Sequence, residues 1–175
     1  MSERMLRVSG IVEESIVDGP GYRFTVFTQG CLHGCPGCHN PQTHPLDGGT
    51  EVSPDEILRM AVDQKPFYGR RGGVTFSGGE PTFQAAALAP LAARIHAQTR
   101  LDVVTYTGYT YEALRDGATA ENAWADLLEQ TDYLIDGPFL LAEKSLELKF
   151  RGSRNQRILD MRATRAAGLP VLTEL

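Results

Sequence analysis

Short runs of β-branched and aromatic residues recur along the chain, and a polar segment rich in glycine follows each of them. The run 23–28 is the clearest, and it predicts a strand. Strands that alternate with helical segments form βαβ units, which predicts an α/β fold with a mostly parallel sheet. A complete eightfold barrel needs about 250 residues. The chain has only 175 residues. We therefore expect a single domain, 1–175, that forms an incomplete (β/α) barrel.

Helix signals separate the predicted strands. Ser53 and Glu56 form a capping box around Pro54, which predicts that a helix begins there. The Ala- and Leu-rich stretch 83–99 predicts a second helix, and 111–129 has a helical pattern that breaks near Gly117. Further strands are predicted at 74–76, 103–106 and 133–135, and a short helix at 141–146.

The charge balance and the hydropathy exclude several classes of protein. Seventeen basic and twenty-two acidic residues give a net charge of -5, which disfavours nucleic-acid binding, because phosphates require clustered Lys and Arg. No apolar run approaches the roughly 20 residues of a membrane span. Residues 1–9 carry charges and no apolar core of a secretory signal, so we expect a cytoplasmic protein without a membrane partner.

The cysteines are the strongest chemical signal in the chain. There are only three, Cys31, Cys35 and Cys38, within eight consecutive residues. An odd number so closely spaced does not fit a disulfide framework. Three thiolates in one short loop suit an iron–sulfur cluster, which usually takes four cysteines. With three, one iron stays open to an exogenous ligand, which indicates chemistry beyond electron transfer.

Two other readings of the cysteine loop stay open on spacing alone. Zinc accepts three cysteines and one histidine, and His33, His39 and His44 all lie close by. Cys35 and Cys38 also have the spacing of a thioredoxin-type dithiol, although that reading leaves Cys31 without a role.

Polar residues at the predicted strand ends form a second candidate site, since ligands bind at the carboxyl ends of parallel strands. In 77–81, the glycines allow close backbone approach to a ligand, and the Glu80 carboxylate can pair with an ammonium group. The alternative for Glu80 is an acid at a helix N-terminus. Thr107 can bind ribose or carboxylate groups or form a local turn. Asp136 is open to the same two interpretations.

The cysteine segment, Cys31-Leu32-His33-Gly34-Cys35-Pro36-Gly37-Cys38, resembles the signature of the radical S-adenosylmethionine enzymes. Many members have an aromatic residue before the third cysteine, where this chain has Gly37. Cys-Pro-Gly-Cys is instead similar to one branch, the activating proteins of anaerobic ribonucleotide reductase. Five other segments match in order. The segment 18–23 resembles the glycyl-radical-enzyme activases, 77–81 resembles the GGE motif of the wider family, and 106–109, 136–139 and 151–156 are similar to the reductase activases. The stretch 161–175 matches no segment of that family.

The resemblance implies a fold of the radical S-adenosylmethionine type and a [4Fe-4S] cluster held by Cys31, Cys35 and Cys38, the catalytic centre. S-adenosylmethionine would chelate the fourth iron, and Glu80 would receive its amino group. The resemblance also implies cofactor contacts by a wider set of residues: Gly37, His39, Ser77, Gly78, Gly79, Glu80, Thr107 and Asp136.

The activity implied by the resemblance is reductive cleavage of S-adenosylmethionine, followed by glycyl-radical formation on an anaerobic (class III) ribonucleotide reductase. A low-potential donor such as a flavodoxin would supply the electron. An open half-barrel encloses a small substrate poorly, so a protein partner is expected to close the site. The alternatives are a radical enzyme acting on another glycyl-radical enzyme or on a small heterocycle, and a zinc-stabilised binding domain without activity.

Overall fold

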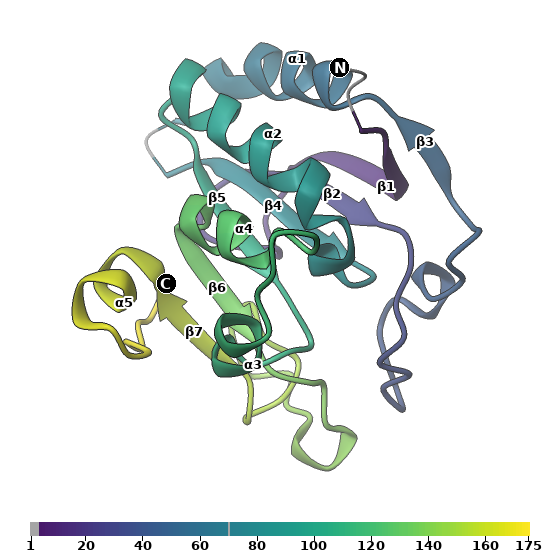
Figure 1. Cartoon of the computed structure of the whole chain (residues 1–175), viewed down its shortest axis with the longest axis vertical. Helices are drawn as coiled ribbons and strands as arrows, with labels where there is room; N and C mark the ends of the chain where they lie inside the picture. The colour runs from purple at the N-terminus through teal and green to yellow at the C-terminus, as the bar shows by residue number, and fades with distance from the viewer. Residues whose placement is uncertain (1–3, 70) are drawn as a thin grey trace.

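The computed structural model describes residues 4–69 and 71–175, which form one seven-stranded sheet with helices on one face (Figure 1). The strands lie in the order β3-β1-β2-β4-β5-β6-β7. Their bounds are β1 Leu6–Ser15, β2 Arg23–Thr28, β3 Thr50–Val52, β4 Gly73–Gly78, β5 Asp102–Tyr106, β6 Tyr133–Asp136 and β7 Arg157–Asp160.

The sheet is parallel only in its middle. Strands β2, β4, β5 and β6 pair in parallel, whereas β1, β3 and β7 join antiparallel at the two edges. The expectation of a mostly parallel sheet is therefore correct for the centre and wrong for the edges. The chain lacks a crossover helix between β1 and β2, and without one a strand returns antiparallel to its neighbour.

Five helices and four short 3-10 turns complete the described chain. The helices are α1 Pro54–Gln64, α2 Ala85–Gln98, α3 Tyr111–Asp116, α4 Trp124–Gln130 and α5 Met161–Ala167. The 3-10 turns are Pro41–Thr43, Lys65–Phe67, Pro81–Gln84 and Leu141–Glu143. No helix among the described residues is long and apolar enough to cross a membrane.

Sequence signals located most of these elements. Ser53 caps α1 by accepting a hydrogen bond from the Glu56 amide, as the capping box predicts. The predicted helical break falls at Gly117, which ends α3. The helix predicted at 141–146 is wrong in extent, since only one turn, Leu141–Glu143, forms there. The edge strands β1, β3 and β7 were not predicted.

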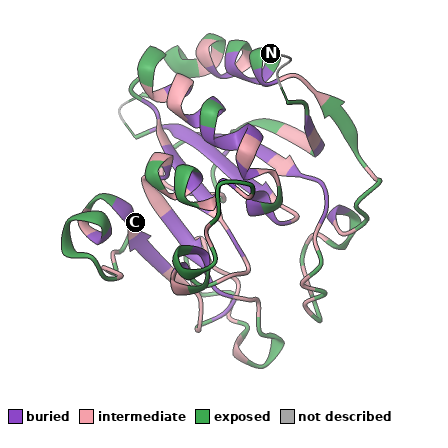
Figure 2. Ribbon diagram, viewed as in Figure 1, coloured by how far each residue is buried: buried purple, intermediate pink, exposed green. Residues whose placement is uncertain are grey.

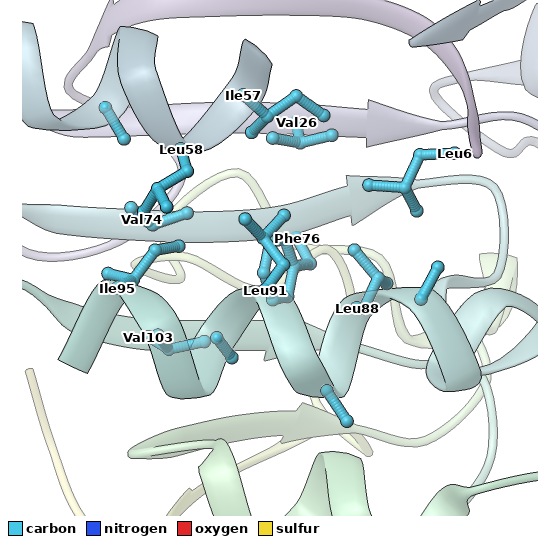
Figure 3. Close-up of a cluster of buried hydrophobic side chains, with 14 of the residues drawn as sticks. Leu6, Val26, Ile57, Leu58, Val74, Phe76, Leu88, Leu91, Ile95 and Val103 are labelled. Atoms are coloured by element: carbon cyan, nitrogen blue, oxygen red, sulfur yellow. The ribbon is translucent and has the colours of Figure 1, made fainter. Parts of the chain in front are cut away.

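The main core lies between the sheet and the helices α1, α2 and α4. Val26, Val74 and Phe76 point from the sheet toward Ile57 of α1 and Leu91 of α2 (Figure 3). All five side chains are fully buried. Because side chains alternate along a strand, the neighbours of these strand residues face the opposite side, where the functional site lies. Figure 2 shows the buried central strands under helices with exposed outer faces.

A second apolar cluster covers part of the opposite face. Val104, Ile135 and Ile158 form its buried centre, and Phe150 packs against them from the segment between β6 and β7. The remainder of this face is left open by the described residues, and it borders the cavity described below.

His96 of α2 lies away from the cysteines and has a structural contact. Its Nε2 is 2.9 Å from Asp132, and this hydrogen bond raises the pKa of His96 above its ordinary value. A raised folded-state pKa stabilises the fold below the unfolded-state value of about 6.5, and that stabilisation is lost as the pH rises through the folded-state pKa. We expect His96→Gln to lower the free energy of unfolding more at about pH 6 than at about pH 9, measured by urea denaturation. An equal loss at both pH values would contradict this assignment.

Candidate functional site

A cavity of about 690 Å³ lies on the open face of the sheet, at the carboxyl ends of its parallel strands. The loop after β2 supplies one wall, and the segment between β6 and β7 supplies another. The predicted site residues that line the cavity are Cys31, Cys35, Cys38, His39, Ser77, Gly78, Gly79 and Thr107. Cys31 and Thr107 are 76 positions apart in the sequence and Cys38 and Ser77 are 39 apart, yet all four line this cavity.

The loop that carries the cysteines leaves β2 at Gly30. Its two ends are fixed by backbone hydrogen bonds, from the Gly30 amide to Thr43 and from the Cys31 amide to His44. Gly34 and Gly37 both have positive φ, of 60° and 76°. Residues with a side chain rarely adopt a positive φ. Glycine at these two positions therefore lets a short loop turn its thiols toward the cavity.

The three thiols suit an iron–sulfur cluster better than a single ion. All three are free and partly exposed on the cavity wall. Among residues 4–69 and 71–175, no three His, Cys, Asp or Glu side chains converge closely enough to hold one metal ion. A cluster binds each thiolate at a different iron, so its ligands stand further apart than those of zinc. The family model reported below, a 4Fe-4S domain, supports the cluster over the zinc alternative.

Burial raises the pKa of the Cys31 thiol above its ordinary value, and the nearby Glu80 raises it further. The thiolate is the form that binds metal. A bound cluster would therefore stabilise a charge that this site alone disfavours, and metal binding would release a proton.

Two glycines at the end of β4 bring the backbone of that strand against the cysteine loop. A Cβ at Gly78 would lie 2.7 Å from the Thr28 amide, and one at Gly79 would lie 2.4 Å from the Gly30 carbonyl oxygen. The Gly79 amide donates to Thr28, and the Glu80 amide donates to Gly30. The close backbone approach expected at these glycines is thus made to the chain itself, while both residues also line the cavity.

Glu80 has a different environment from the one expected. Its side chain is 1% exposed and is not part of the cavity lining. Five donors reach its two oxygens: the amide and hydroxyl of Thr82, the Thr107 hydroxyl, the Gly108 amide and the His33 imidazole. A carboxylate has about four lone-pair positions. An ammonium group would compete with these donors for the Glu80 oxygens, and the ammonium-binding role of Glu80 stays a prediction.

Asp136 is also fully buried, and it too lies outside the cavity lining. Its oxygens accept hydrogen bonds from the Arg157 guanidinium at 2.5 and 3.0 Å and from the Tyr111 amide at 2.7 Å. These contacts are the ones expected for the structural alternative, a satisfied residue at a strand end, and the cofactor-binding role of Asp136 stays a prediction. Thr107 lines the cavity but donates its hydroxyl to Glu80.

The two predicted residues beside Cys38 have separate surroundings. His39 lines the cavity, with its ring 5.4 Å from that of Phe139. Gly37 does not line it, and a Cβ there would lie 2.8 Å from Leu141. The cysteine loop thus contacts the segment between β6 and β7 on both sides of Cys38.

The cavity wall formed by 148–152 was not predicted as cofactor-binding. Tyr106 donates its hydroxyl to the Phe150 carbonyl, at 2.7 Å, and Phe150 has a positive φ of 63°. Arg151 lines the cavity and donates to the Gln156 carbonyl. The sequence signal for this wall was the match of 151–156 to the activases, but the match alone gave these residues no role.

The structure combines a mixed α/β sheet with three free thiols on a cavity at the carboxyl edge of that sheet. This arrangement is typical of proteins that carry a cluster beside a small-molecule site. The chain belongs to the family described as "4Fe-4S single cluster domain", whose sequence model matches residues 17–159. The donor set fits the group, because three thiols, a glycine-lined wall and no fourth cysteine leave one cluster position for another ligand.

The chain is also similar to individual curated proteins over most of its length. It is 35% identical to the anaerobic ribonucleoside-triphosphate reductase-activating protein of Vibrio cholerae over 82% of this chain and 90% of that protein. The Escherichia coli protein of the same name is 34% identical over 84% of this chain and 94% of its own length. The pyruvate formate-lyase-activating enzyme of Clostridium pasteurianum is 40% identical, but the match covers 75% of this chain and only 51% of that enzyme.

Proposed function

We propose that this protein activates an anaerobic ribonucleotide reductase by placing a radical on one of its glycine residues. The observation that carries the proposal is that the three thiols and the residues Ser77–Gly79 line the same cavity. The relatives that match nearly the whole chain are reductase-activating proteins, which supports this partner over others.

When bound, a reduced [4Fe-4S] cluster supplies one electron to the sulfonium of S-adenosylmethionine, which gives methionine and a 5'-deoxyadenosyl radical that takes a hydrogen atom from the glycine Cα. The protein's own groups bind and orient. Cys31, Cys35 and Cys38 would hold the cluster, and Ser77, Gly78 and Gly79 line the cavity, where they can contact the methionine part. Glu80 and Asp136 lie outside the cavity lining, and their oxygens accept hydrogen bonds from Gly108 and Arg157.

The partner completes the wall that this chain leaves open. The sheet ends at β7 and does not close on β3, which supports the incomplete barrel of the radical S-adenosylmethionine type. Two leucines of the segment between β6 and β7, Leu141 and Leu146, are 53% and 88% exposed. Apolar side chains beside a reactive cavity suit burial against a protein substrate, which would exclude water.

A flavodoxin or another low-potential protein is the proposed electron donor, in the cytoplasm. The net charge of -5 supports the absence of a nucleic-acid partner. Neither a membrane nor a further protein is needed for the proposed reaction.

The experiment that tests this function uses the anaerobically reconstituted protein with dithionite, S-adenosylmethionine and purified reductase. We expect a glycyl-radical signal in electron paramagnetic resonance, with one 5'-deoxyadenosine formed for each radical. Pyruvate formate-lyase serves as the competing substrate, because one group of relatives carries that name. A radical on the lyase and none on the reductase would overturn the choice of partner. A cluster without 5'-deoxyadenosine in the presence of either substrate would overturn the reaction.

A further inference from the structure

His33 makes the contact that holds the middle of the cysteine loop. It lies between Cys31 and Cys35, and its Nε2 is 2.6 Å from the Glu80 Oε2. Within the described chain, this is the one hydrogen bond from a side chain of residues 32–37 to another part of the protein. The backbone bond inside the loop, from the Cys38 amide to Cys35, is local. The middle of the loop therefore depends on His33 for a polar tie to the sheet.

Glu80 is a rigid point for that tie. Its carboxylate is held by Thr82 from its own turn and by Thr107 and Gly108 from the end of β5. A buried acceptor with several donors has little freedom to move. A side chain bonded to Glu80 is thereby fixed relative to both β4 and β5.

The shape around His33 fits its ring closely. A Cβ at Gly108 would lie 2.6 Å from the His33 Cδ2, so the ring occupies the space that a side chain would need. Tyr109 meets the ring edge-on at 4.7 Å, and Phe83 stacks at 6.4 Å. The His33 side chain is only 18% exposed. Packing and hydrogen bonding together hold one orientation of the imidazole.

We propose that His33 is the positioning residue of the cysteine loop: it ties the loop to Glu80 and thereby sets where the three thiols meet the cluster. His33 is not a cluster ligand in this assignment, and no proton transfer is asked of it. The inference rests on the proposed function only in that the thiols bind a cluster. It also gives Glu80 its role, as the anchor of the loop.

The test measures the cluster itself. Wild-type protein and the variants His33→Ala, His33→Gln and Leu32→Ala are reconstituted anaerobically with iron and sulfide, and the rate of iron loss to a chelator is followed. Leu32 is the matched control, since it is the adjacent loop residue and is 71% exposed. We expect about tenfold faster loss from His33→Ala, as for residues that orient metal ligands. His33→Gln, which keeps a donor for Glu80, should restore most of the retention, and Leu32→Ala should behave as wild type.

The spectrum of the dithionite-reduced cluster separates positioning from general destabilisation. We expect His33→Ala to shift and broaden its electron paramagnetic resonance signal, while the cluster-free variant unfolds near the wild-type temperature. If His33→Ala does not fold, Gly108→Ala takes its place, because the added Cβ displaces the ring. Wild-type retention and spectrum in the variant tested would overturn the proposal, and so would a His33→Gln no better than His33→Ala. A stable wild-type cluster that forms no glycyl radical would refute the proposed function and leave this inference standing.

Discussion

Alanine in place of Cys35 will reduce cleavage of S-adenosylmethionine to the level measured without protein. Cys35 lines the cavity with Cys31 and Cys38, and the chain contains no other cysteine to replace it. Loss of one thiolate from a three-thiolate site leaves two irons without protein ligands, so an intact [4Fe-4S] cluster will not persist. The measurement is chromatography of 5'-deoxyadenosine after anaerobic reconstitution and dithionite reduction.

The control for this experiment is Leu32→Ala, in the same loop, which should retain wild-type cleavage because the Leu32 side chain is exposed. Full cleavage activity in Cys35→Ala would show that the cysteines do not hold the cluster that performs the reaction. Cys31→Ala and Cys38→Ala should give the same loss as Cys35→Ala.

Replacing Glu80 by alanine will have the largest effect on stability. The substitution removes an acceptor that five donors share, two of them on Thr82 and one each on Thr107, Gly108 and His33. Each buried donor left without a partner costs about 1–3 kcal/mol. We expect a loss of about 3–5 kcal/mol in the free energy of unfolding, measured by urea denaturation of the cluster-free protein.

Two matched variants test the cause of that loss in the free energy of unfolding. Glu80→Gln retains one carbonyl acceptor, so it should lose less stability than Glu80→Ala. Glu121→Ala removes an exposed carboxylate and should stay within about 0.5 kcal/mol of wild type. A Glu80→Ala protein as stable as wild type, with weakened binding of S-adenosylmethionine, would return Glu80 to the ammonium-binding role that the sequence suggested.

The central strands were predictable because each carries a local pattern that ends at a glycine-rich segment. The run 23–28 coincides with β2. Because most of its side chains are buried, a shift in the pairing of this strand with its neighbours would be costly. Strand β1 lacked such a signal, since its bulges, Gly10 and exposed residues near 13–14 interrupt the alternation. Strand β7 has only four residues and takes its place through antiparallel pairing with β6, a long-range contact that no local pattern encodes.

The cysteines were predictable for a similar reason, because their spacing is local. The environments of Glu80 and Asp136 were not. The His33 contact to Glu80 spans 47 positions, and the Arg157 contact to Asp136 spans 21. A carboxylate at a strand end looks the same in sequence whether its oxygens face a ligand or are taken up by donors from other strands. Only the fold distinguishes the two.

The paired backbone hydrogen bonds between Gly79 and Thr28 and between Glu80 and Gly30 join the cysteine loop to the turn after β4. Because no side chain separates the two backbones, neither can be displaced far without the other. The ordering of both segments is therefore completed when the protein folds, and little conformational entropy remains to be lost when a ligand binds. Such preorganisation predicts that ligands reaching this wall meet a surface already in its bound form, so that affinity is limited by contacts and by access.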